Sequence, residues 1–440
     1  MVSSCGALSP SELAARSGWP RALLEDRTKM PEIVDDVSSF LSFLCYGDHS
    51  AAQMCVLRGG LQKLGLADSL HPAFLDAVRR GVDAVECVAE VIDKNLAGWC
   101  NGLDGDVFCW PSGSSTRQTI KHGTMRKRLE RCLEQTRNGA VAYIAELSHD
   151  NKSPHCLTGE KCRALTTRDM RDSVGGRLPM WDRGHCFVGG EGVGSCLHVD
   201  QAWWSNIAKN FLGYKLVALW GPDEAEVALA KCEGQLMRRP LSQEQCEVLC
   251  LASRVALMQP GDIVSFTGGL PHVAMVVGDG LNVTAYESFV NFHPRSAELL
   301  LRGAARTPER GVMPLRALHG LLDDVVDAVR LAETYGDSSN IFPIQAAPPA
   351  CGMCPAELLA QFRKVLLRRA RCARRMLGSS CVQDSSSEDS SSSSDSEAAA
   401  KVKVADDGSR AAQCCTTPAM DHEDESAARP CKRQRPSEIS

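Results

Sequence analysis

Short apolar segments separated by glycine turns fill the chain from about residue 139 to residue 292. Examples are "GYKLVALWGP", "PGDIVSFTGG" and "HVAMVVGDG". Apolar runs of this length bounded by Gly and Pro are typical of β-strands, and most follow one another too closely for a helix to fit between them. Only the stretch 222–256 has a helical pattern, and we expect it to be inserted between two strands. The pattern predicts a β-sandwich or barrel rather than βαβ units.

Helical patterns flank this β-rich part. Residues 30–100 place apolar residues at spacings of three and four, and a similar pattern returns after residue 293. The last segment is dominated by serine and acidic residues, as in "SSSEDSSSSSDSE", and cannot bury enough apolar surface to fold. We therefore expect an α+β chain with four parts: a helical N-terminal region (1–130), a β domain (131–295), a helical C-terminal region (296–378) and a disordered tail with a short basic cluster (379–440).

Composition excludes several classes of protein. The 440 residues carry a formal net charge of -5, which gives no global attraction to nucleic acid or to an anionic membrane. No stretch approaches the roughly 18 consecutive apolar residues of a membrane helix, and the first 20 residues lack the pattern of a secretory signal. The 21 cysteines are scattered singly, as free thiols would be, and the isolated "CGMC" is a weak zinc motif. We expect an intracellular protein, in the nucleus or cytoplasm, with "CKRQRP" favouring the nucleus.

A histidine and a carboxylate two residues apart, His198 and Asp200, stand in the segment "SCLHVDQ". On a strand they project to the same face, while Leu197 and Val199 project to the other. A hydrogen-bonded core pair is the simpler interpretation of the two alone. His272, in "TGGLPHVAMVV", is placed to arrive on another strand. Two imidazoles and one carboxylate form the facial set that binds Fe(II) and leaves three positions for a bidentate co-substrate and dioxygen.

A lysine accompanies these three residues. Lys215, in "GYKLVALW", shares one strand face with Val217 and Leu219. A lysine among apolar neighbours is costly unless it meets an anion, although a surface position on an edge strand would also explain it. The far carboxylate of 2-oxoglutarate is such an anion, and the Ser195 hydroxyl is a further donor to it.

The run "CFVGGEGVGSCLHVDQAWW…FLGYKLVALWGP…LMQPGDIVSFTGGLPHVAMVV…AYESFVNF" resembles the Jumonji C (JmjC) family of Fe(II)- and 2-oxoglutarate-dependent oxygenases over roughly 180–292, about a quarter of the chain. The resemblance implies a double-stranded β-helix of the cupin or jelly-roll type. It also implies that His198, Asp200 and His272 bind iron, and that Lys215 and Ser195 contact 2-oxoglutarate.

The chain departs from the family pattern before the distal histidine, where Leu270 and Pro271 replace the tryptophan or tyrosine that members often show, and at two positions that concern contacts to 2-oxoglutarate. Many members carry an asparagine or tyrosine seven residues before the lysine, where this chain has Ala208, so that Asn206 and Asn210 are both candidates for that role. The strand "LNVTAYESFVN" should supply another polar contact to 2-oxoglutarate, and Thr284 and Tyr286 remain alternatives.

By the resemblance, the expected function is an oxygenase that hydroxylates or demethylates a protein side chain, with a histone as one candidate substrate and dioxygen as oxidant. Two alternatives stay open: a catalytically silent scaffold protein that keeps the JmjC fold, and an RNA-modifying oxygenase, which the basic helix around 363–375 keeps in view. Helices that follow the β domain often mediate dimerisation in this family, which implies a homodimer as a candidate state.

Overall fold

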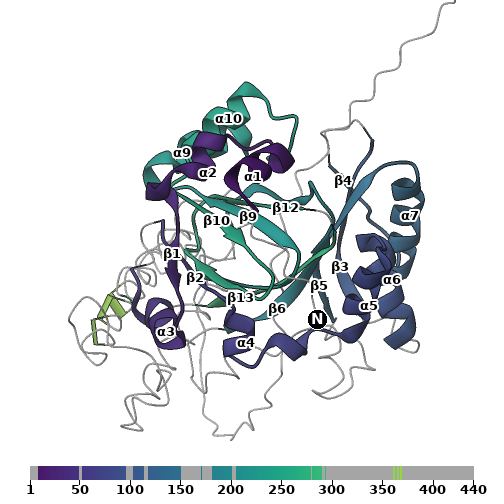
Figure 1. The fold of residues 1–440 in the computed structure, drawn as a ribbon, viewed down its shortest axis with the longest axis horizontal. Coiled ribbons are helices and arrows are strands. Elements are labelled where there is room, and N and C mark those ends of the chain that lie inside the picture. The colour runs from purple at the N-terminus through teal and green to yellow at the C-terminus, as the bar shows by residue number, and fades with distance from the viewer. Residues whose placement is uncertain are drawn as a thin grey trace, which may run out of the picture.

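The computed structural model describes residues 8–48, 52–95, 103–112, 117–149, 170, 181–200, 205–278, 280–289 and 293, with six positions between 360 and 368. The described chain is a mixed α/β structure with one large and one small β-sheet (Figure 1). No described helix is long and apolar enough to span a membrane. The "CGMC" motif, the serine-rich tail and most of the region predicted to be helical after residue 296 lie outside the described residues.

The large sheet has nine strands and is antiparallel except for its first pair. In spatial order its strands are β1 (Glu32–Val34), β2 (Met54–Leu57), β11 (Ile263–Phe266), β8 (Ser205–Leu212), β13 (Asn282–Phe289), β6 (Trp181–Gly189), β5 (Val141–His149), β3 (Leu103–Trp110) and β4 (Gln118–Thr119). Residues 1–130, which the sequence assigns to a helical region, therefore also supply four strands of this sheet.

The small sheet has four antiparallel strands. In spatial order they are β10 (Arg254–Met258), β9 (Tyr214–Leu219), β12 (His272–Val277) and β7 (Gly194–His198). Val217 and Leu219 of β9 pack in one cluster with Val264 and Phe266 of β11, so the two sheets face each other across an apolar layer. The alternating side chains of the strands explain this packing, because Leu216 and its even-numbered neighbours point away from that layer.

Helices cover the outer face of each sheet. The outer face of the small sheet lies under α1 (Pro10–Ser17), α2 (Arg21–Glu25), α9 (Pro222–Cys232) and α10 (Gln243–Cys250), which gather beside β9, β10 and β12 in Figure 1. The large sheet packs against α3 (Val37–Tyr46), α4 (Gly60–Lys63), α5 (Pro72–Arg80), α6 (Ala84–Asn95) and α7 (Met125–Arg137). Short 3-10 helices span η1 (Arg27–Lys29) and η2 (Ala67–Ser69). The prediction that 222–256 inserts helices between strands is confirmed, since α9 and α10 lie between β9 and β10.

Candidate metal centre

His198, Asp200 and His272 come together at the end of the small sheet. His198 ends β7 and pairs directly with His272, the first residue of β12. The Nε2 atom of His198 lies 3.3 Å from one Asp200 carboxylate oxygen, and the Nε2 atom of His272 lies 3.7 Å from the other. The three potential ligand atoms all lie within 4.8 Å of one another, so the group could hold a metal ion.

Both imidazole rings are oriented by backbone carbonyls. The Nδ1 atom of His198 is 2.6 Å from the carbonyl oxygen of Cys196, and the Nδ1 atom of His272 is 3.1 Å from that of Leu270. A carbonyl oxygen only accepts hydrogen bonds, so each Nδ1 carries the proton and donates it. This leaves the lone pair of each Nε2 directed toward Asp200. Metal-binding histidines are commonly held in this way, with the second ring nitrogen fixed by a hydrogen bond.

The carboxylate is held by its own partners. The side-chain amide of Asn206 donates a hydrogen bond of 2.7 Å to Asp200, and the Ser288 hydroxyl donates one of 2.9 Å to the Asn206 oxygen. Burial acts to raise the pKa of Asp200, but the two histidines and Asn206 outweigh it and hold that pKa below its usual range. Asp200 is therefore ionised at neutral pH, as a metal ligand must be.

The pKa values of the two histidines shift in opposite directions. Burial lowers the pKa of His272, and it remains lowered overall although the Asp200 charge opposes the shift. Burial also lowers the pKa of His198, but its hydrogen bond and charge interaction with Asp200 raise it more. Two imidazole nitrogens and one carboxylate oxygen form a donor set compatible with an iron site, because this set leaves other coordination positions open.

Lys215 lies on the inner face of β9 and is fully buried. Its Nζ donates a 3.3 Å hydrogen bond to the Tyr143 hydroxyl. Three aromatic rings surround it, with centroids 5.1 Å (Tyr286), 5.6 Å (Tyr143) and 5.8 Å (Phe187) from Nζ. Burial lowers the pKa of Lys215 to about 7. Within the described part of the chain no carboxylate forms an ion pair with the Lys215 amine.

Ser195 shares the inner face with the metal ligands because β7 contains a bulge. A regular strand would place residues 195 and 198 on opposite faces. The ladder instead pairs His198 with His272 and Ser195 with Ala274, so that two residues of β7 stand opposite Val273 alone. Because Ala274 pairs with Val217 on the other side, Ser195 stands between the row of His272 and the row of Lys215.

Only one of the two alternatives on β13 reaches the lysine. The Tyr286 ring lies against Lys215, as described above, and its hydroxyl pKa is raised by burial. The Thr284 hydroxyl instead hydrogen-bonds with the side chains of Asn210 (3.0 Å) and Asn282 (2.9 Å). Thr284 and Asn210 thus belong to a buried amide cluster. Of the two candidate asparagines, Asn206 is the one that contacts the metal triad.

The sequence interpretation missed Tyr143. This residue lies on β5, outside the segment that resembles a known family, and reaches the site only because β5 joins the large sheet beside β6. An isolated tyrosine in "AVAYIAEL" gives no signal of this placement.

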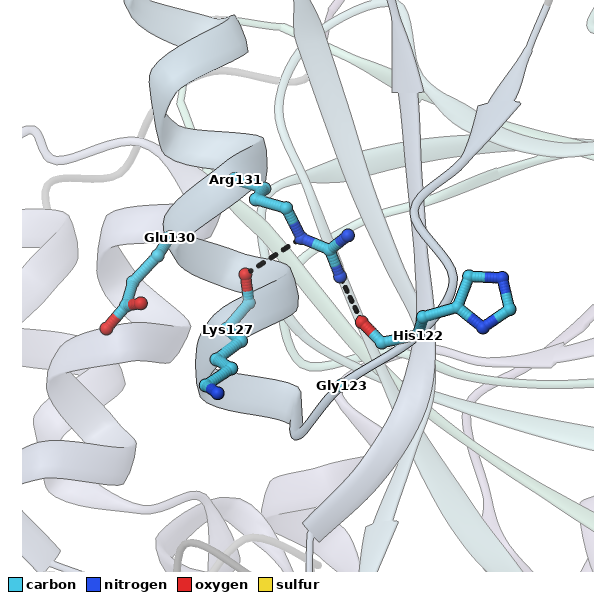
Figure 2. Close-up of a pocket in the computed structure, with 5 residues that line it drawn as sticks. All are labelled: His122, Gly123, Lys127, Glu130 and Arg131. Atoms are coloured by element: carbon cyan, nitrogen blue, oxygen red, sulfur yellow. Dashed lines mark hydrogen bonds between the residues drawn. The ribbon is translucent and has the colours of Figure 1, made fainter.

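A cavity of about 440 Å³ lies away from this group of residues, at the start of α7 (Figure 2). It is lined by His122, Gly123, Lys127, Glu130 and Arg131. The Arg131 guanidinium donates hydrogen bonds to the carbonyl oxygens of Lys121 (2.9 Å) and His122, which tie the turn to the helix. The imidazole of His122 points away from Arg131 in Figure 2, and the hydrogen bonds to the turn explain the position of Arg131.

Known proteins do not assist the assignment. A scan against protein-family models finds no match to this chain, and a search of curated proteins finds none either.

Proposed function

We propose that this chain is an Fe(II)- and 2-oxoglutarate-dependent oxygenase of the JmjC type, acting on a protein side chain by hydroxylation or demethylation. The observation that carries the proposal is that the His198, Asp200 and His272 group shares one inner sheet face with a buried lysine that lacks an anion. Each feature alone has a structural explanation. Together they match the two ends of a bound dicarboxylate co-substrate.

The strand order supports the proposed double-stranded β-helix. From β6 to β13 the chain alternates between the two sheets at every step except β9 to β10. The resulting orders, β6–β13–β8–β11 and β7–β12–β9–β10, are those expected when a long hairpin winds into two facing sheets.

In this proposal His198, Asp200 and His272 hold the iron. Iron with 2-oxoglutarate and dioxygen supplies the oxidation of a C–H bond, coupled to decarboxylation of 2-oxoglutarate to succinate. Lys215 and the Tyr143 hydroxyl bind the distal carboxylate. That anion favours the protonated lysine, so the amine takes up and holds a proton when the co-substrate binds. Ser195 lies between the metal ligands and Lys215, and its hydroxyl donates a hydrogen bond to the bound 2-oxoglutarate.

Aromatic side chains surround the proposed binding site. Phe266 packs on His272 with ring centroids 5.2 Å apart, and Phe187 packs edge-on against Tyr286 at 5.0 Å. These rings exclude water from the lysine end, which strengthens its pairing with a carboxylate. A scaffold protein has no need of a buried lysine without a counter-charge, so this residue favours the enzyme over the scaffold.

The test is an anaerobic titration of Fe(II) and 2-oxoglutarate into the purified protein, monitored by the visible iron-to-2-oxoglutarate charge-transfer band. We expect the band in the wild type, its loss in His198→Ala and a weaker affinity for 2-oxoglutarate in Lys215→Met. His122→Asn, a change at an exposed histidine of the α7 turn, is the matched control and should leave the band intact. A folded wild-type protein that gives no band with both components in excess would contradict the proposal.

A further inference from the structure

The large sheet continues beyond the strands that face the small sheet. Three of its strands, β5, β3 and β4, lie past β6, and the small sheet ends at β7. On these strands a separate apolar cluster contains Phe108, Trp110 and Tyr143 together with Cys196 of β7. Phe108 pairs directly with Tyr143, whose hydroxyl is the hydrogen-bond partner of Lys215. The cluster therefore extends from the proposed 2-oxoglutarate site toward the edge of the large sheet.

Two arginines lie over the aromatic rings of this cluster. The guanidinium carbon of Arg117 is 4.2 Å from the centroid of the Phe108 ring, and that of Arg238 is 5.6 Å from the centroid of the Trp110 ring. The two rings belong to one face of β3, at positions two residues, or about 7 Å, apart along the strand. The two guanidinium groups are therefore neighbours on the same face of the sheet.

Both guanidinium groups lie near one residue of β7. Burial raises the pKa of the Cys196 thiol, and the charges of Arg117 and Arg238 oppose that shift, as does a hydrogen bond from Arg117. Cys196 is two residues before His198, and its carbonyl oxygen orients the His198 imidazole. The arginine pair is therefore next to the strand that carries the first metal ligand.

The hairpin of β3 and β4 holds Arg117 in this position. Phe108 pairs with Thr119 of β4, and Arg117 precedes Thr119 by two residues, so strand alternation places both on the face of the two rings. Arg117 is half-buried, and among the residues that the structure describes no carboxylate forms an ion pair with it. Two like charges that are close together and partly shielded from water favour an anion between them.

We propose that Arg117 and Arg238 bind an acidic side chain, an aspartate or a glutamate, that lies near the modified residue in a protein substrate. The inference rests on the proposed function and deepens it by naming a charge that the substrate carries. A guanidinium group pairs with a carboxylate through two parallel, charge-assisted hydrogen bonds, and a ring beneath it holds its plane in place.

An extended peptide fits this arrangement. β4 lies two strand spacings, about 10 Å, beyond the strand of Tyr143, and three residues of an extended peptide cover that interval. RNA fits it less well, because single-stranded nucleic acid binds through exposed aromatic faces on which bases stack. Phe108 and Trp110 are only 4% and 1% exposed, and the arginines lie over them.

The binding test uses two fluorescein-labelled peptides of glycine and serine that differ only in three central residues, which are aspartates in one and asparagines in the other. Affinity is measured by fluorescence anisotropy with the full chain, both metal-free and loaded anaerobically with Fe(II) and 2-oxoglutarate. We expect the aspartate peptide to bind at least about tenfold more tightly, the effect of one charge-assisted hydrogen bond. The net charge of the chain is -5, so global attraction cannot produce this preference.

Three variants assign the preference to the arginine pair. Arg117→Met keeps an apolar stem against Phe108 and removes the charge, so it should abolish the preference for the aspartate peptide. Arg117→Lys keeps the charge without the planar group and should recover only part of the preference. Arg137→Met, the same change at an exposed position at the end of α7, is the matched control and should keep all of it.

A purely structural role for Arg117 gives a different result. If the arginine serves only to hold the hairpin against β7, the wild type binds the two peptides equally, and this comparison needs no variant to fold. Equal affinities in the wild type would therefore overturn the proposal, as would an Arg117→Met variant that still prefers the aspartate peptide. Tighter binding of a single-stranded RNA of the same length, lost in Arg117→Met, would assign the arginines to nucleic acid and overturn it as well.

The two proposals fail in different ways. Absence of the charge-transfer band in the wild type overturns the oxygenase, whereas the metal-free peptide titration still tests the arginine pair. A band that forms normally, combined with equal affinities for the two peptides, overturns the arginine site alone. Arg117→Met should keep the band, because Arg117 contacts neither the metal ligands nor Lys215.

Discussion

Replacing Lys215 by methionine should make the ligand-free protein more stable, and the gain should depend on pH. Methionine matches the length of the lysine stem and carries no charge, so it can fill the same space among the three aromatic rings. In the wild type, burial lowers the pKa of this amine from its ordinary value of 10.5 to about 7. Below pH 7 the lysine is protonated in both the native and the unfolded chain, and the native state bears the whole cost of burying the charge.

The size of this cost follows from the shift. A drop from 10.5 to about 7 corresponds to an upper bound of about 5 kcal/mol at 1.36 kcal/mol per pKa unit. Between the two pKa values the unfolded state binds more protons than the native state, so the free energy of unfolding of the wild type rises with pH. The cost is about 5 kcal/mol at pH 6 and about 1.5 kcal/mol at pH 9.5. The stability advantage of Lys215→Met should therefore shrink by roughly 3 kcal/mol over that interval.

Urea unfolding of both proteins at pH 6, 7.5 and 9.5 measures this difference directly. Lys121→Met, a change at an exposed lysine, is the matched control and should show no pH-dependent gap. Adding 2-oxoglutarate and Fe(II) should stabilise the wild type by about 2.7 kcal/mol when the ligand is at 100 times its Kd. This narrows the gap at pH 6 and reverses the order of the two proteins at pH 9.5, where the cost of the buried lysine is only about 1.5 kcal/mol. A gap that stays constant with pH, or a Met variant that is less stable at pH 6, would refute the argument that burial of a charge governs this site.

Three further changes test the surroundings of the site. Gly194→Ala would place a Cβ 2.0 Å from the Ala274 carbonyl oxygen, so β7 and β12 must separate; we expect a loss of about 3 kcal/mol in thermal or urea unfolding and weaker metal binding by calorimetry. Asp262→Ala removes the buried carboxylate that pairs with Arg58 and accepts two backbone N–H groups, and should cost about 3–5 kcal/mol in the free energy of unfolding. Tyr143→Phe removes the hydroxyl that partners the buried lysine, and should weaken 2-oxoglutarate binding by roughly fivefold in the charge-transfer titration, about 1 kcal/mol.

The proximity of His198, Asp200 and His272 could be predicted from the sequence because two of them are only two residues apart and the third begins a strand. His198 and His272 lie on β7 and β12, whose inward positions bring them together, whereas Asp200 lies two residues beyond the end of β7. The same alternation places Lys215 with Val217 and Leu219 on the inner face. Period-two patterns need only local sequence, so these placements do not depend on knowing which strands are neighbours.

Tyr143 could not be predicted, because its role depends on sheet order. It lies 72 residues before Lys215, and their contact requires β5 to pair with β6 at one particular register. Register between distant strands is set by how both strands bury their apolar faces and is not encoded in either segment alone. The strands β1, β2 and β4 escaped notice because they have only two to four residues, and β3 because Asp104, Gly105 and Asp106 interrupt its apolar pattern.

Ser195 has a further reason for being hard to place. It stands at a bulge in β7, and the bulge adds a residue that breaks the period of two. Ser195 is three residues from His198 yet shares its face. The apolar face is kept in register, with Leu197 still packed in its core. The extra residue in β7 therefore keeps the Ser195 hydroxyl on the inner face, because by strict alternation the third residue before His198 would point into the outer core instead.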